Sequence, residues 1–243
     1  MINIRKVLFL LLLILASKFQ VKPQLKLDYS MDLGQSNVSQ GLYLSTALLA
    51  AYSLDKYTLD AGAQFQLQHP ANKVFSAAEF AASRSFTIGK QALEVEAFFI
   101  HRNFSSLMFL TDWGLAVTMR MRHWQFDLGQ DFKSYRVRER ALSYETEGMV
   151  LRENFNLVYN LAYFVNSPEQ PWNISLSLTN RDCFLINQET NPMLNLRAEM
   201  QVSSTMKVYL ENWYKLAGSL NMSAHHFGYF IRTGLIWIPA FGN

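Results

Sequence analysis

The sequence has few of the residues that form disulfides, zinc cages and transmembrane helices. Its 243 residues include a single cysteine, Cys183, which excludes an intramolecular disulfide and a cysteine-based zinc cage. Because Cys183 lies far from the N-terminus, it cannot carry the lipid of a lipoprotein. After the N-terminal region, no stretch approaches the roughly eighteen consecutive apolar residues of a membrane-spanning helix. We therefore expect no transmembrane helix in the mature chain.

An excess of one charge is also missing. The 22 basic and 19 acidic residues give a formal net charge of +3, and they form no long block of like charge. This excludes the basic stripe of a nucleic-acid-binding protein and a charged disordered tail. The sequence has no phosphate-binding glycine loop, and the adjacent His225 and His226 would point to opposite faces of a strand. We therefore expect no nucleic-acid partner, no cofactor and no metal.

The N-terminus has the pattern of an export signal. Arg5 and Lys6 precede the uninterrupted apolar run "VLFLLLLILA", residues 7–16. Ten apolar residues are about half of what a helix needs to cross a bilayer. We therefore predict that residues 1–24 are a signal peptide, with a cleavage point between about residues 17 and 25, and that residues 25–243 form one domain. A buried core helix or an uncleaved anchor remains an alternative for the apolar run.

Beyond the signal, the chain alternates between apolar and polar residues almost throughout. In "LMFLTDWGLAVTMRMR", residues 107–122, the odd positions are mainly apolar and the even positions include Asp112, Arg120 and Arg122. Alternation of this kind indicates β-strands with two different faces. The pattern predicts about twelve strands, near residues 25–36, 40–54, 57–69, 73–88, 91–104, 107–122, 124–135, 148–165, 172–187, 193–203, 205–217 and 226–240. Strands of soluble sheets usually have about five or six residues, whereas about ten can cross a bilayer.

The connections and the aromatic residues indicate where these strands would lie. Short connections alternate with longer ones, except that the short set has one longer member, residues 166–171. This pattern is typical of a membrane barrel with short periplasmic turns and long external loops. Under that assignment two belts of aromatic residues would face the lipid headgroups. The inner belt would contain Tyr52, Tyr57, Trp124, Tyr163, Trp172 and Trp237, and the outer belt Phe65, Phe109, Phe132, Phe184, Tyr214, Phe227 and Tyr229.

The last strand supports the same interpretation. The segment "FGYFIRTGLIWIPAF", residues 227–241, resembles the closing strand of bacterial outer-membrane β-barrel proteins, which the barrel-assembly machinery reads. The resemblance covers about residues 25–241, and it departs from the class because Gly242 and Asn243 follow the terminal aromatic residue. It implies an all-β, transmembrane, antiparallel up-and-down barrel in the outer membrane of a Gram-negative cell, in contact with outer-membrane lipid. The assembly signal would consist of Tyr229, Ile231, Leu235, Trp237 and Phe241.

The inward faces of such a barrel bear on its function. The alternation places eleven acidic and eleven basic side chains in the lumen, which predicts no strong preference for one charge. We expect the lumen lining to include Asp112, Arg120, Arg122, Asp127, Asp131, Arg152, Arg181, Arg197, Glu199 and Arg232. Twelve strands lie between the side-chain-filled interior of eight and the open channel of sixteen or more. The protein is therefore predicted to be a structural barrel or a narrow, porin-like passage for small polar solutes.

Other functions stay open as alternatives. The external loop at residues 136–147 could contact an envelope protein, as expected for a barrel subunit of a secretion or envelope-assembly complex. A soluble secreted β-sandwich would also show alternating strands. An outer-membrane lipid hydrolase would need a Ser–His arrangement, and no recognisable one is formed by His101, His123, His225, His226, Ser105, Ser106 and Ser223. We therefore expect no enzymatic activity and assign no catalytic residue.

Overall fold

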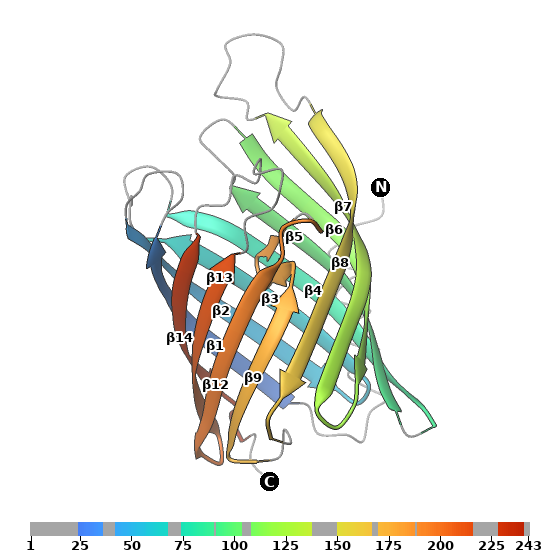
Figure 1. The fold of residues 1–243 in the computed structure, drawn as a ribbon, viewed down its shortest axis with the longest axis vertical. Coiled ribbons are helices and arrows are strands. Elements are labelled where there is room, and N and C mark those ends of the chain that lie inside the picture. Colours follow the sequence, from blue (N-terminus) through green and yellow to red (C-terminus); the bar gives the residue numbers. More distant parts are fainter. Residues whose placement is uncertain are drawn as a thin grey trace, which may run out of the picture.

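The structure is a computed structural model that describes residues 24–35, 42–67, 74–89, 91–103, 108–137, 150–166, 170–187, 189–215 and 228–240. It is a closed barrel of twelve strands (Figure 1). The wall strands are β1 (Gln24–Gln35), β2 (Leu42–Leu54), β3 (Tyr57–Gln66), β4 (Phe75–Ile88), β5 (Gln91–Asn103), β6 (Met108–Arg120), β7 (Trp124–Val137), β8 (Val150–Phe164), β9 (Trp172–Thr179), β12 (Met193–Ser203), β13 (Met206–Lys215) and β14 (Tyr229–Trp237). The predicted number of strands is confirmed. The predicted signal peptide lies outside the described residues.

Pairing of the first and last strands closes the wall. β1 pairs with β2 on one side and with β14 on the other, and Leu27 lies opposite Trp237. All wall pairs are antiparallel, so the predicted up-and-down topology is also confirmed. A closed barrel leaves no free sheet edge, which is the condition for β-strands to span lipid. Within the described part of the chain, no α-helix is long and apolar enough to cross a membrane.

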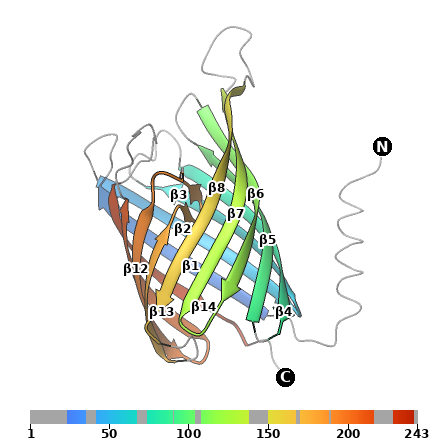
Figure 2. The same cartoon turned by 45° about the vertical axis from the view of Figure 1, so that its right-hand side comes forward.

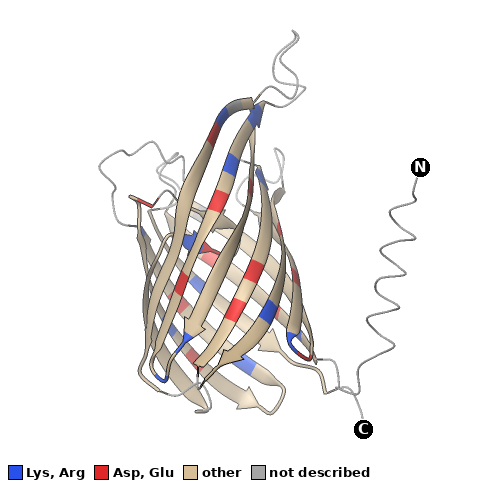
Figure 3. Cartoon of the chain, turned by 90° about the vertical axis from the view of Figure 1, so that its right-hand side faces the viewer, with Lys and Arg blue, Asp and Glu red and all other residues tan. Residues whose placement is uncertain are grey.

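The two faces of the strands differ as the sequence pattern predicted. The outer face exposes large apolar side chains, and Phe155 and Leu128 are 66% and 62% exposed. A surface this apolar is unfavourable in water and favourable in lipid, so the outer face is suited to a bilayer. The predicted inner-belt aromatics are all exposed on this outer face: Tyr52, Tyr57, Trp124, Tyr163, Trp172 and Trp237. Lys, Arg, Asp and Glu are interspersed among other residues along the strands (Figure 3).

The connections alternate in length around the barrel. At the short-turn end, two-residue turns join β2 to β3, β4 to β5 and β12 to β13. Asp55 and Gly89 have φ angles of 54° and 63° in these turns, where a left-handed backbone reverses the chain tightly. Most of the longer connections lie at the other end, called the long-loop end below; the exception is the seven-residue connection between β8 and β9, residues 165–171, at the short-turn end. At the long-loop end, β8 rises beyond β9 and β12 (Figures 1 and 2).

One predicted strand, at residues 172–187, is wrong in its second half. β9 ends at Thr179, and the chain then leaves the wall and folds into the barrel. Residues 180–192, described except for residue 188, are called the inward segment below. The segment contains a small hairpin of β10 (Arg181–Asp182) and β11 (Leu185–Ile186). Phe184, predicted to face lipid in the outer belt, is therefore inside the barrel and 1% exposed.

Asn180 explains why the chain can leave the wall at this point. Its side-chain nitrogen donates to the carbonyl oxygen of Leu157 at 2.7 Å, and its side-chain oxygen accepts from the backbone N–H of Tyr159 at 2.9 Å. Both partners are backbone groups of β8 that a longer β9 would have paired. The backbone of Asn180 also accepts from the N–H of Asn187 at 2.7 Å, which closes the base of the hairpin. The Asn180 side chain thus replaces the missing strand and satisfies buried backbone groups.

Candidate functional site: the lumen and its inward segment

Three consecutive apolar residues of the inward segment contact three different parts of the barrel wall. Phe184 packs with residues of β2 and β4, Leu185 with residues of β12, β13 and β14, and Ile186 with residues of β4, β5, β6 and β8. Their wall partners are Ala47 and Ala77 for Phe184, Met193, Trp213 and Phe230 for Leu185, and Ala81, Phe98, Ile100, Ala116 and Val158 for Ile186. All three side chains are at most 2% exposed. The hairpin therefore crosses the lumen as an apolar plug.

A glycine in the wall makes room for this plug. A Cβ atom at Gly62 of β3 would lie 3.1 Å from the ring of Phe184 and 2.9 Å from the side chain of Leu49. Contacts this close would force one of the two side chains to move. The absence of a side-chain carbon at position 62 thus leaves room for the ring of Phe184 to pack closely against β3.

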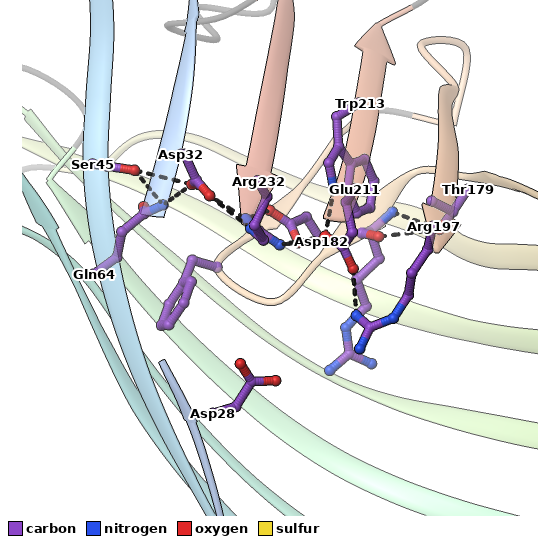
Figure 4. A network of polar contacts seen from close by, with 12 residues as sticks. Asp28, Asp32, Ser45, Gln64, Thr179, Asp182, Arg197, Glu211, Trp213 and Arg232 are labelled. Atoms are coloured by element: carbon purple, nitrogen blue, oxygen red, sulfur yellow. Dashed lines mark hydrogen bonds and ion pairs between the residues drawn. The ribbon is translucent and has the colours of Figure 1, made fainter. Parts of the chain in front are cut away.

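Arg232 of β14 is the first charged anchor of the inward segment. Its guanidinium binds both carboxylate oxygens of Asp182 at 2.7 and 2.8 Å and donates to Asp32 of β1 at 2.7 Å (Figure 4). A carboxylate oxygen of Glu211 on β13 lies 3.4 Å from the same guanidinium group. Arg232 is only 4% exposed, so these carboxylates supply the compensation that a buried charge needs.

Asp182 is held ionised by this arrangement. It lies on the inward segment, outside the membrane-spanning strands. Burial would raise the pKa of its carboxyl, but the charge and hydrogen bonds of Arg232 outweigh burial, so the pKa of Asp182 lies below its usual value.

Arg181 is the second charged anchor, and it points to the opposite side of the lumen. Its guanidinium donates to the two carboxylate oxygens of Glu96 on β5 at 2.7 and 2.8 Å, and to Glu79 on β4 at 3.2 Å. The same group lies over the ring of Phe98, 4.2 Å from its centre. Two neighbouring residues of the hairpin, Arg181 and Asp182, thus bind opposite walls with opposite charges.

Wall cations also bind the backbone of the plug. Lys133 of β7 donates to the carbonyl oxygen of Ile186 and forms an ion pair with Asp112 of β6 at 3.2 Å. Arg102 of β5 donates to the carbonyl oxygen of Phe184 at 3.2 Å. These bonds satisfy carbonyl groups that the sharp hairpin would otherwise leave unpaired in the interior.

Between the plug and the short-turn end lies a chamber of about 600 Å³. Its lining includes Lys26, Arg120, Gln125 and Phe164, which lie at or near strand ends, and Arg181, Asp182 and Cys183 of the inward segment. Eight carboxylates and five basic groups line it, an excess of three carboxylates. They are Asp28, Asp60, Glu79, Glu94, Glu96, Asp127, Asp182 and Glu211, with Lys26, Arg120, Arg181, Arg197 and Arg232. The interior is thus only partly filled by side chains.

The structure places most of the predicted lumen residues inside the barrel, in separate groups. Asp112 and Asp131 are buried beside Lys133, and Arg120 and Asp127 line the chamber. Arg197 pairs with Glu199 at 2.8 Å and also with Glu211, so these residues form one network with Arg232. Arg181 faces the lumen from the inward segment and not from a wall strand.

Two of the predicted positions lie away from these networks. Arg152 is exposed near the long-loop end of β8, where its guanidinium donates to Asn154. The placement of Arg122 in the lumen is wrong, because Arg122 is exposed in the turn between β6 and β7.

The sequence pattern did not identify Asp182, Phe184 or Asn180 as lumen residues. A signal was present in "TNRD", residues 179–182, where four polar residues interrupt the alternation. Continuing β9 through them would have placed Asn180 and Asp182 on the lipid face, where a carboxylate is costly.

The C-terminal strand has the orientation that an assembly signal would require. Tyr229, Ile231 and Trp237 are exposed on the outer face of β14, and Leu235 shares that face. Phe241 lies outside the described residues. The role of these residues in assembly stays a prediction.

The described histidines do not approach one another. His101 is near the long-loop end of β5, where its ring lies 5.3 Å from that of Phe109. His123 is in the turn between β6 and β7, with Nδ1 3.0 Å from the carbonyl oxygen of Phe164. His225, His226, Ser105, Ser106 and Ser223 lie outside the described residues. Among the residues that the structure describes, no three His, Cys, Asp or Glu side chains are placed to hold a metal ion.

Comparison with known proteins shows the fold. No protein-family model and no curated protein matches the chain. Among solved structures, it is similar to an outer membrane channel from Pseudomonas putida F1, with 12% identity and a TM-score of 0.56, over 92% of this chain and 98% of that chain. It is also similar to the KdgM porin in complex with disordered oligogalacturonate (12% identity, TM-score 0.53, 89% and 99% of the two chains) and to the NanC porin (9%, 0.50, 89% and 100%). The predicted resemblance to outer-membrane β-barrels is thus confirmed at the level of the fold.

Proposed function

We propose that the protein is a narrow-pore barrel of the bacterial outer membrane, which passes small polar solutes and is constricted by its inward segment. The chamber carries this proposal. A barrel with only a structural role could fill its interior with side chains, whereas here a polar chamber of about 600 Å³ leads from the short-turn end to the plug. The fold, which is shared with a channel and two porins, supports a place in the outer membrane.

The position of the plug supports control of passage. Phe184, Leu185 and Ile186 block the lumen from a connecting segment that belongs to no wall strand. Displacement of this segment would leave every wall pair intact, so the barrel could open without unfolding. The proposed pore is therefore closed when the segment is docked and conducts when it is displaced.

Conductance in planar bilayers tests this function. Purified wild-type barrel is compared with a variant in which residues 181–186 are replaced by six Gly and Ser residues. We expect rare, small openings for the wild type and steady, larger openings for the variant, because the plug and both charged anchors are removed. Heat-shifted mobility on gels serves as the control that both proteins are closed barrels. A folded variant that conducts no ions would contradict the pore.

We further propose that the protein is not an enzyme, since the described histidines lie at opposite ends of the barrel. Phospholipase assays on the purified protein check this, and turnover would overturn it. A role as a subunit of an envelope complex through residues 136–147 remains the second candidate, and it predicts capture of an envelope protein that is lost when this loop is shortened.

A further inference from the structure

We infer that the chamber between the plug and the short-turn end selects small cations over anions, including organic solutes with ammonium groups. This inference rests on the proposed function, because it names the class of solute that the pore would pass. The sequence pattern of the whole barrel predicted equal numbers of acidic and basic side chains in the lumen, and the chamber differs from that prediction. The difference arises because only part of the lumen belongs to the chamber.

The excess of carboxylates is the first observation. Eight carboxylates and five basic groups line the chamber. The three arginines closest to the plug are occupied: Arg181 by Glu79 and Glu96, Arg197 by Glu199 and Glu211, and Arg232 by Asp32, Asp182 and Glu211. An anion in the chamber would have to displace these carboxylates to reach any of these three guanidinium groups. The other two basic groups of the lining are Arg120, which lies 3.8 Å from Glu94, and Lys26.

Three other carboxylates form no ion pair with described residues, and they lie on different strands. Asp28 of β1 accepts the hydroxyl of Tyr209 at 2.7 Å, and Asp127 of β7 accepts the side-chain nitrogen of Asn160 at 2.8 Å. Asp60 of β3 is half-buried and has no hydrogen bond within the described part of the chain. These groups line the part of the wall from β1 to β7, so their fields add within the chamber and attract cations.

A buried amide provides a second, independent observation. Asn195 of β12 lines the chamber and is 9% exposed, and its side-chain oxygen has no hydrogen-bond partner among the described residues. A buried carbonyl oxygen without a partner is unfavourable unless a donor or a cation reaches it. Asn195 lies on the same face of β12 as Arg197 and opposite Trp213 of β13 in the sheet. Asn195 thus provides a neutral acceptor at the chamber wall that no described donor uses.

The single cysteine allows the electrostatic potential to be measured without conduction. Cys183 lines the chamber, so methanethiosulfonate reagents of similar size and opposite charge compete for one site. A unit charge about 7 Å away in water changes the local concentration of an ion about threefold, before screening by salt. Relative to a free thiol, we expect the cationic reagent to react several-fold faster than the anionic one. The Asp60→Asn/Asp127→Asn double variant should move this ratio toward that of the free thiol, because two carboxylates of the chamber lose their charge.

Controls separate charge from structure. Glu153→Gln removes one exposed carboxylate outside the chamber and should leave the ratio unchanged. If packing shields Cys183 from both reagents, the ratio is measured in the Phe184→Ser/Ile186→Ser variant, which opens the plug without changing any charge. A ratio at or below that of the free thiol would overturn the inference.

The reversal potential in a potassium chloride gradient links the chamber to permeation. We expect potassium to permeate more readily than chloride, and the double variant to lose most of this preference. A conducting pore that prefers chloride would overturn the inference and leave the pore intact. A cationic preference at Cys183 in a barrel that never conducts, even with the plug opened, would keep the selective chamber and contradict the proposed function.

Discussion

Replacement of Phe184 by alanine would weaken the contact between the inward segment and the wall. The phenyl ring is buried against Ala47, Ala77 and the space left by Gly62. Truncation of a buried phenylalanine costs about 3–5 kcal/mol, because contacts are lost and a cavity remains. Since every 1.4 kcal/mol is about a factor of ten, the equilibrium between docked and displaced segment should shift by on the order of 10² to 10³. The wall strands do not depend on this ring, so the barrel itself should stay folded.

Two assays measure this shift. Single-channel recording should show a large increase in open probability, with a conductance per opening similar to that of rare wild-type openings. The rate of Cys183 modification should rise together with the open probability, because the thiol lies next to Phe184 on the hairpin. Phe155→Ala is the matched control. That phenylalanine is 66% exposed on the outer face, so its truncation should change neither readout.

The reasoning would be refuted by a folded Phe184→Ala barrel with wild-type open probability and wild-type thiol reactivity. Such a result would mean that the charged anchors alone hold the segment, or that the segment is not the barrier to ions. Equal effects of Phe184→Ala and Phe155→Ala would also refute it, because only the Phe184 ring belongs to the plug.

Three further substitutions test other parts of the site. Arg232→Met leaves the buried carboxylates of its network without their cation and should lower the free energy of unfolding by about 3–5 kcal/mol in urea titrations, whereas Arg152→Met, at an exposed position, should cost less than about 1 kcal/mol. Gly62→Val should displace the Phe184 ring and raise the open probability, and a wild-type value would show that the wall yields instead. Asp182 has a lowered pKa, so its contribution to docking is complete above the ordinary carboxyl pKa of 3.8 and is lost as the pH falls through its lowered value. Asp182→Asn should therefore show raised thiol reactivity at neutral pH, and its difference from the wild type should persist down to about pH 4 and disappear only below it.

The wall of the barrel was predictable because a single physical rule governs it. Each strand has one face in lipid and one in the lumen, so a period of two recurs in strands as different as β3 and β14. The turn and loop lengths gave the direction of the strands, and the aromatic side chains of Trp124 and Trp172 lie on the outer face as predicted.

The inward segment was not predictable from the same rule. Phe184 and Ile186 have the parity of a lipid-facing strand, but they are apolar because they contact the wall from inside. Only the polar residues 179–182 before them argue against a strand. The chain can leave the wall there because the Asn180 side chain bonds the backbone groups of β8 that a longer β9 would have paired. The balance of charge in the chamber also could not be derived from alternation. It depends on the height of each residue along the barrel, which the register of the strands sets.

The position of the inward segment is the central claim, and the accessibility of Cys183 to a bulky maleimide polymer tests it most directly. In the native barrel in detergent micelles, Cys183 should stay unlabelled until the protein is unfolded. A cysteine at exposed position 189 of the same segment, made as Glu189→Cys in a Cys183→Ser background, should be labelled at once. Rapid labelling of native Cys183 by the polymer would place the segment outside the lumen and contradict the plug.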